Sequence, residues 1–265
     1  MLRNWFRVSK GVPVSSIAGL ARAWLGGGTD ARASSPLQFS SDDLCVLDGY
    51  YAKMFAVLED VHRAALRDMA DRGCKTVLEV ACGTGWCAPL AGEVGLDYIG
   101  LDISETAVAG ALLKYPTFCF LNLPVHRCEL LNEKAFDAVY SSSMLEHIGR
   151  VEEAIGAMWR LSRRRLDLAF YEGLTDAPEH SFRFVPYERS EPPRAWGGRY
   201  GMKVALQDHG PRDGRSGKTA VPGYFLNQFS RARLHESLRS LPQASHVEMR
   251  DFDGPLRSWV TVYRA

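Results

Sequence analysis

The sequence predicts an α/β fold built on a parallel sheet, and three observations lead to it. The apolar run 77–80 has the composition of a strand and ends in a turn that contains Gly83 and Gly85. The residues that follow, 86–94, are compatible with a helix. A second apolar strand, 98–101, comes soon after that helix. Strands that alternate with helices in this way are typical of parallel sheets covered by helices.

The turn after the first strand has the composition of a ligand-binding loop. Glycine at positions 83 and 85 lets the backbone bend sharply and approach a ligand, because a Cβ atom at either position would obstruct that approach. The second strand ends in Asp102, an acid placed where it can accept hydrogen bonds from the paired hydroxyls of a ribose. These residues indicate a nucleoside-binding domain.

Three motifs resemble those of the class I S-adenosylmethionine (SAM)-dependent methyltransferases. The first is an acid followed by a glycine-rich turn, Glu79 to Gly85, in which Ala81 stands where the family usually has its first glycine. The second is Asp102 at the end of the next strand. The third is FDAVYSSSMLEHI, residues 136–148, which is similar to the family's fourth strand and the segment after it.

The resemblance implies a Rossmann-like sheet of seven strands with a parallel core, a C-terminal antiparallel hairpin and helices on both faces. It also implies SAM as the cofactor and a small polar acceptor, for which a sugar or glycan precursor is one candidate class. No metal site is expected. The residues expected to contact the cofactor are Glu79, Ala81, Gly83, Gly85, Asp102, Ile103, Asn122 and Ser141.

His147 is the candidate catalytic residue. Methyl transfer to a hydroxyl needs a group that removes a proton, and the unperturbed pKa of imidazole suits a general base. Leu-Glu-His is also frequent in the resembling family whatever the substrate. A role in orienting the loop therefore stands beside the catalytic role on equal terms.

Two other classes of protein fit part of the pattern. Residues 83–88 also match the G-x-G-x-x-A of a nicotinamide dinucleotide site, as in a nicotinamide-dependent reductase. That class has no evident use for Glu79 or for the 136–148 segment. The second alternative is a protein that binds SAM as a sensor or scaffold without doing chemistry.

The chain divides into an N-terminal arm and one main domain. Residues 1–43 are expected to form a basic helix and a small-residue linker, and a helix packed on the domain or a partly disordered arm explains them better than membrane contact. Residues 44–265 are expected to form the methyltransferase domain. Its glycine- and proline-rich insertion, 174–229, lacks regular periodicity and leaves the end of the fifth strand. There it can fold over the crevice as a substrate lid, and a solvated insertion is the alternative.

Helix ends are also visible in the sequence. Ser104 is the expected N-cap of a helix over 105–114, and Ser230 the expected N-cap of a helix that follows it. A helix over 151–164 is expected to carry four arginines, at 160 and 163–165, around its C-terminus, where cations suit the helix dipole.

Composition limits the remaining classes. A net charge of +1 and a pI near 7.7 argue against a protein dominated by nucleic-acid binding. The six cysteines include no C-x-x-C pair, which indicates reduced thiols in a cytoplasmic protein. No stretch approaches the ~20 apolar residues that a membrane-spanning helix needs. The expected partner is a small-molecule substrate, and the sequence does not predict the oligomeric state.

Overall fold

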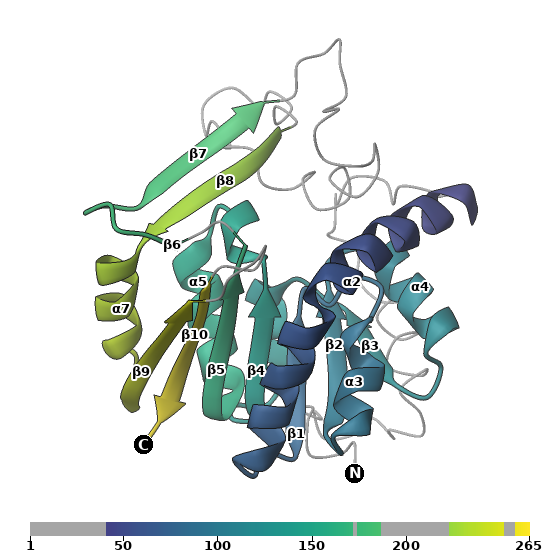
Figure 1. Ribbon diagram of the computed structural model, residues 1–265, viewed down its shortest axis with the longest axis horizontal. Coiled ribbons are helices and arrows are strands. Elements are labelled where there is room, and N and C mark those ends of the chain that lie inside the picture. Colours follow the sequence, from purple (N-terminus) through teal and green to yellow (C-terminus); the bar gives the residue numbers. More distant parts are fainter. Residues whose placement is uncertain (1–40, 172–173, 187–222, 252–257) are drawn as a thin grey trace.

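The computed structural model describes residues 41–171, 174–186, 223–251 and 258–265 of the chain (Figure 1). Nearly all of the expected N-terminal arm, 1–43, lies outside these residues, as does the middle of the 174–229 insertion. None of the described helices is long and apolar enough to cross a membrane.

The core of the protein is one mixed sheet of seven strands, in the order β3-β2-β1-β4-β5-β10-β9. Neighbours among the first five strands in this order run parallel, and β10 runs antiparallel to both β5 and β9. This confirms the expected parallel core with a C-terminal antiparallel hairpin. The strands are β1 (Thr76–Val80), β2 (Asp97–Asp102), β3 (Cys119–Asn122), β4 (Phe136–Ser142), β5 (Ser162–Phe170), β9 (Ala244–Asp251) and β10 (Ser258–Arg264).

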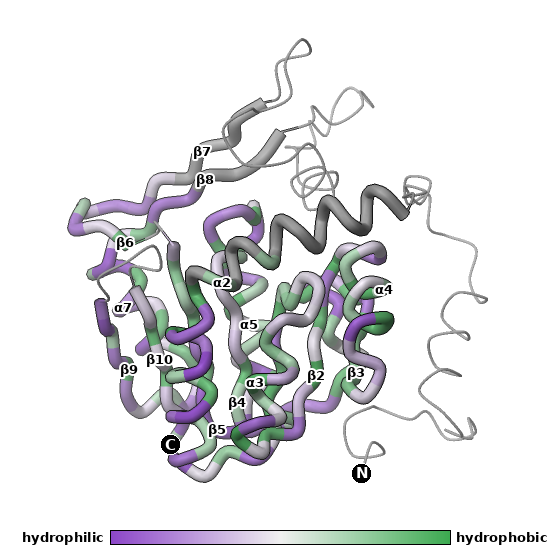
Figure 2. Tube along the Cα trace, turned by 45° about the vertical axis from the view of Figure 1, so that its right-hand side comes forward, coloured by the Kyte–Doolittle hydropathy of each residue, from purple (hydrophilic) through white to green (hydrophobic). Residues whose placement is uncertain are grey.

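Helices cover both faces of the sheet. One buried apolar cluster joins α2, α3 and α4 to one face, and another joins α5 and α7 to the opposite face. In Figure 1, α2 and α3 cross in front of the strands and α5 lies behind them. Figure 2 shows hydrophilic residues gathering on the outlying elements α7 and β9. The helices are α2 (Ser41–Asp71), α3 (Cys87–Glu93), α4 (Glu105–Lys114), α5 (Val151–Leu161) and α7 (Arg231–Arg239), with short 3-10 helices η2 (Val125–Leu130) and η3 (Leu145–His147).

Both expected serine caps are confirmed. The hydroxyl of Ser104 accepts a hydrogen bond from the backbone N–H of Ala107 at 3.1 Å, at the start of α4. The hydroxyl of Ser230 accepts one from the N–H of Arg233 at 3.4 Å, at the start of α7. Each serine satisfies one of the backbone donors that a helix N-terminus leaves without an intrahelical partner.

The predicted arginine-rich helix end is wrong. Helix α5 ends at Leu161, so only Arg160 lies in its last turn, and residues 163–165 belong to β5. The competing interaction is the ladder with β4, which pairs Ser162 with Phe136 directly after the helix. Pairing in the sheet therefore overrides the helix propensity of this run.

Arg165, the last of these arginines, connects α2 to the central sheet. Arg165 is buried, and its Nε and Nη2 donate to the carboxylate of Asp167 at 2.8 and 2.7 Å. Its Nη1 donates to Asp68 of α2 at 2.8 Å. Asp167 also accepts hydrogen bonds from Trp259 and Thr261 of β10, at 3.0 and 2.8 Å. One guanidinium thus connects α2, β5 and the C-terminal hairpin.

Replacing Arg165 should destabilise the protein strongly. Arg165→Met leaves the fully buried carboxylate of Asp167 without its counter-ion, which costs about 3–5 kcal/mol of unfolding free energy. The matched control is Arg164→Met, because Arg164 is exposed and a surface substitution of this kind changes stability by roughly 1 kcal/mol or less. Urea unfolding of both variants measures the difference, and equal losses would contradict the assignment.

The insertion after β5 contains secondary structure that the sequence did not predict. Its two ends form an accessory sheet of order β6-β8-β7, with β6 (Leu174–Thr175), β7 (Ser181–Pro186) and β8 (Gly223–Ser230). Strands β7 and β8 pair antiparallel from Ser181–Gln228 to Pro186–Gly223. In Figure 1 this sheet stands above the carboxyl ends of the central strands. The sequence showed no regular periodicity here, because the pairing joins segments that are far apart in the sequence.

Candidate functional site

The candidate site lies where the strand order reverses, at the carboxyl ends of the strands around β1. Strand β1 pairs with β2 on one side and with β4 on the other. Ligands of open α/β sheets bind at such a switch point, because the loops there leave in opposite directions and open a crevice. The glycine turn after β1, Asp102 at the end of β2 and η3 after β4 all belong to this edge.

The structure brings the two main motifs into direct contact. Asp102 Oδ2 accepts a hydrogen bond from the backbone N–H of Gly83 at 2.8 Å, and Oδ1 accepts one from the N–H of Ser104 at 2.8 Å. The carboxylate is buried, and this burial raises its pKa, while the backbone donors act in the opposite direction. A carboxylate has about four acceptor positions, so further hydrogen bonds can be accepted. Asp102 is therefore fixed in place with acceptor capacity left for a pair of hydroxyls.

The turn adopts a left-handed backbone at three places. Residues Ala81, Gly83 and Gly85 have φ angles of 63°, 54° and 78°. An L-residue with a side chain pays roughly 1 kcal/mol for this conformation, so Ala81 is strained where the resembling family has glycine. Backbone hydrogen bonds from Cys82 to Leu101 and from Gly85 to Cys82, both 3.0 Å, hold the turn.

Gly85 is needed for a different reason from the one the sequence suggested. A Cβ atom at this position would lie 2.6 Å from the ring of Phe120 and 3.1 Å from the methyl group of Ala111. The space beside it is therefore filled by the protein's own core. Gly85 contributes to the site through backbone shape and close packing rather than through an open approach for a ligand.

Thr84, between the two glycines, was missed from the sequence. Its side chain is 1% exposed, and its hydroxyl has no hydrogen-bond partner within the described part of the chain. An unsatisfied buried hydroxyl costs about 1–3 kcal/mol. A polar group of a bound ligand would remove this penalty. The only signal in the sequence was its position inside the glycine turn.

Glu79 lies within a buried polar network beneath the turn. The hydroxyl of Tyr98 donates to its carboxylate, and Cys87 also hydrogen-bonds to it. Burial raises the pKa of Glu79 to about 7. The network continues through Tyr140, whose hydroxyl hydrogen-bonds His62 of α2, and burial lowers the pKa of His62 to about 4. Glu79 thus connects the base of the glycine turn to β2, α3 and α2.

Three other predicted residues lie at the same edge. The amide of Asn122 donates to the backbone carbonyls of Asp102 and Ile103 at 3.2 and 2.9 Å, so it supports the loop that carries the acid. The Ile103 side chain is 37% exposed. The hydroxyl of Ser141 is buried and donates to the carbonyl of Val80 at 2.9 Å, which ties β4 to the end of β1.

His147 ends η3, directly after β4. Its side chain is half-buried, and its backbone N–H donates to the carbonyl of Met144 at 2.9 Å. The structure also shows a contact that the sequence did not predict. Asn227 of β8 donates to backbone carbonyls on either side of Glu146 and His147, so the accessory sheet meets the candidate catalytic turn.

No group of three or more potential metal ligands occurs among the residues described. Cys74, Cys82, Cys87, Cys119 and Cys128 are free thiols. Burial raises the pKa of Cys82 and of Cys87 well above the ordinary value, so the two cysteines near the glycine turn stay as neutral thiols.

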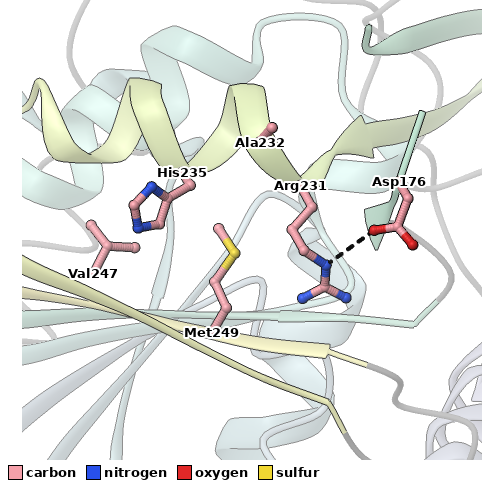
Figure 3. Close-up of a pocket in the computed structure, with 6 residues that line it drawn as sticks. All are labelled: Asp176, Arg231, Ala232, His235, Val247 and Met249. Carbon is pink, nitrogen blue, oxygen red and sulfur yellow. Dashed lines mark ion pairs between the residues drawn. The ribbon is translucent and has the colours of Figure 1, made fainter. Parts of the chain in front are cut away.

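A separate cavity of about 500 Å³ lies between α7 and β9, away from this edge (Figure 3). The charge of Arg231 in its wall is already neutralised, by Asp251 at 2.8 Å and by Asp176 at 3.7 Å. None of the predicted site residues lines it. Its lining residues are Asp176, Arg231, Ala232, His235, Val247 and Met249.

Comparison with known proteins agrees with this geometry. Residues 78–165 match the family model of a methyltransferase domain. The fold is similar to that of DesVI from Streptomyces venezuelae, with 16% identity and a TM-score of 0.54 over 82% of this chain and 98% of that one. No curated protein sequence matches the chain.

Two further solved structures are similar at 17% identity and a TM-score of 0.50. One is the Burkholderia thailandensis 1,6-didemethyltoxoflavin-N1-methyltransferase with bound 1,6-didemethyltoxoflavin and S-adenosylhomocysteine, which covers 90% of this chain and 98% of that one. The other is the N-terminal domain of EvdMO1 in the presence of S-adenosylhomocysteine (SAH) and D-fucose, which covers 77% and 82%. At such identities, the similarity shows a shared fold.

The matched segment contains the glycine turn, Asp102 and the turn after β4, which are the parts that the geometry assembles. Residues 78–165 thus form a methyltransferase domain with SAM as its cofactor, and the fold is that of the class I SAM-dependent methyltransferases. This decides against the nicotinamide-dependent reductase that the glycine turn alone left open.

The buried acid should give stability a distinctive pH dependence. Because burial raises the pKa of Glu79 from 4.5 to about 7, the unfolded state ionises this carboxyl at a lower pH than the folded state. The contribution of Glu79 to the unfolding free energy should fall from about pH 4.5 to pH 7, by up to about 3 kcal/mol, and then level off. His62 acts in the opposite direction, since its lowered pKa removes stability as the pH falls from 6.5 to 4.

Glu79→Gln removes the first effect and keeps an acceptor for Tyr98. The unfolding free energy of the variant should therefore decrease only as the pH falls. It should exceed that of the wild type by the largest amount above pH 7. Urea unfolding at several values between pH 5 and 8 measures this. A difference in unfolding free energy between variant and wild type that stays constant from pH 5 to 8 would show that Glu79 ionises normally.

Proposed function

We propose that this methyltransferase transfers the methyl group of SAM to a hydroxyl or amino group of a sugar or glycan precursor. The observation that carries the cofactor assignment is the hydrogen bond between Asp102 and Gly83, which joins the ends of two neighbouring strands. The acceptor class is supported by the fold shared with the EvdMO1 domain, whose structure was obtained with D-fucose.

Each part of the cofactor has suitable partners along this edge. The remaining acceptor positions of Asp102 suit the two ribose hydroxyls. The amide N–H groups of Asn122 are used on backbone carbonyls, so its oxygen is left to accept from the adenine amine. The exposed side chain of Ile103 suits the apolar face of the adenine ring.

The amino-acid end of the cofactor belongs at the turn after β1. Ala81, Gly83 and Gly85 shape the backbone there, and the unpartnered hydroxyl of Thr84 suits a polar group of the methionine moiety. Glu79 steadies the turn from below. We assign Ser141 to the wall of the site on the β4 side.

SAM supplies a methyl group on a positively charged sulfur, which leaves as the neutral sulfide. The protein's part is to hold the acceptor oxygen or nitrogen in line with the carbon–sulfur bond, because alignment contributes much of the rate. As the new bond to carbon forms, the acceptor loses a proton. His147, on the turn after β4, takes this proton.

The domain division follows from the same proposal. Residues 44–265 form the methyltransferase domain, and its 174–229 insertion covers the acceptor side as a substrate lid. Support comes from the accessory sheet, which stands above the carboxyl ends of the central strands in Figure 1. Residues 1–43 form an arm outside the catalytic unit. A cytoplasmic location stays a prediction.

Replacing Asp102 should weaken SAM binding. Asp102→Asn loses one charged acceptor for the ribose, and we expect the dissociation constant from calorimetric titration to rise about tenfold to a hundredfold. Asp97→Asn is the matched control, because Asp97 begins the same strand at its opposite end and is exposed. Undiminished affinity in Asp102→Asn would overturn the cofactor assignment.

Replacing His147 should slow the chemical step. SAH formation is measured across a panel of free and nucleotide-linked sugars that includes D-fucose, and His147→Ala should reduce turnover by about a hundredfold or more. His126→Ala, an exposed histidine of η2, serves as control. A loss of only a few-fold would leave His147 with an orienting role. Wild-type protein that binds SAM but never yields SAH would favour the sensor or scaffold alternative.

A further inference from the structure

One side chain of the accessory sheet reaches the turn that follows β4. Asn227 of β8 is 3% exposed, and its Nδ2 donates to the carbonyl oxygen of Leu145 at 2.8 Å and to that of Ile148 at 2.7 Å. These two carbonyls bracket Glu146 and His147. A residue contributed by the insertion after β5 therefore holds the turn that carries the proposed base.

The turn has little other support from its own backbone. The 3-10 helix η3 is three residues long, and the described backbone hydrogen bond within it runs from His147 to Met144. Carbonyl groups at the end of a short helix have no partner inside the helix, and leaving them buried without one is costly. The two hydrogen bonds from Asn227 meet this need at Leu145 and Ile148 together.

The chemistry at position 227 is specific to an asparagine. A single amide nitrogen carries two hydrogens, so one short side chain can serve both carbonyls, and the two acceptors fix the orientation of the amide. An aspartate has the same shape but places an oxygen against the carbonyl oxygens. A serine has one donor hydrogen, and an alanine has none.

The strand that presents Asn227 is itself held on both sides. In the ladder with β7, Asn227 pairs with Phe182. Phe229 packs against Phe170 of β5 with ring centroids 5.4 Å apart, and the N–H of Ser230 donates to His180 Nδ1 at 3.0 Å. Asn227 is thus mounted on a fixed strand, between the accessory sheet and the central sheet.

We propose that Asn227 is a positioning residue that fixes the turn 145–148 and so aims His147 at the acceptor. The proposal rests on the proposed function of His147 as the base. Under this proposal the accessory sheet contributes to catalysis, because the geometry of the turn depends on β8. Asn227 acts through the turn and leaves the cofactor residues after β1 and β2 untouched.

The test compares Asn227→Asp, Asn227→Ser and Asn227→Ala with the control Gln228→Ala. Gln228 is the next residue of the same strand, and its side chain is exposed. Amide hydrogen exchange in residues 145–148 should accelerate tenfold or more in Asn227→Asp and Asn227→Ala, less in Asn227→Ser and not in the control. SAM affinity from calorimetry should stay within threefold of the wild type. Turnover of the acceptor found in the sugar panel should fall about a hundredfold, with the KM for SAM unchanged.

Several outcomes would overturn the proposal. One is normal exchange over 145–148 in both Asn227→Asp and Asn227→Ala, and another is turnover within threefold of the wild type. An equal loss of SAM affinity and turnover would also do so, because it indicates general damage. If the larger changes prevent folding, Asn227→Ser, which keeps one donor hydrogen on a shorter side chain, supplies the comparison. Failure of the proposed function would appear differently, because the wild-type protein would then form no SAH. The hydrogen-exchange comparison would still test whether Asn227 holds residues 145–148.

Discussion

A single hydrogen bond, from the backbone N–H of Gly83 to the carboxylate of Asp102, sets the geometry of the cofactor site. It joins the turn after β1 to the end of β2 and fixes the acid in a buried position. The second oxygen of the carboxylate is held by Ser104, which also caps α4. The position of one acid is thus determined by the turn before it and by the helix behind it, and the site is ordered by the fold itself.

Polar groups buried around this contact tie the surrounding layers together. On the β2 side, Glu79 and Tyr98 connect two strands, and His62 with Tyr140 extends the connection to α2. Further along the sheet, Arg165 links the same helix to β5 and, through Asp167, to β10. Buried polar groups of this kind are costly unless each has a partner. The sequence places those partners on elements that must pack correctly, so packing and electrostatics specify the same arrangement.

The local features were predictable from sequence, and the long-range ones were not. The cap at Ser104 and the acid at the end of β2 were found because each depends on neighbouring residues, and the sheet followed from the resemblance. The end of α5 was misplaced, because the ladder between β5 and β4 decides where the helix stops. The accessory sheet and the Asn227 contact were not predicted for the same reason, since they join residues far apart in the chain. The reason for Gly85 also lay at a distance, in the ring of Phe120.

The backbone at Ala81 bears on how such proteins are recognised. The loop keeps its shape although a methyl group stands where a hydrogen is customary, since the positive φ angle of 63° is tolerated at a modest energetic cost. What the fold requires at this position is a dihedral angle rather than one amino acid. Asparagine or aspartate could meet that requirement, and valine or isoleucine could not. A sequence motif that requires glycine at all three positions of this turn would not detect chains with alanine at the first of them.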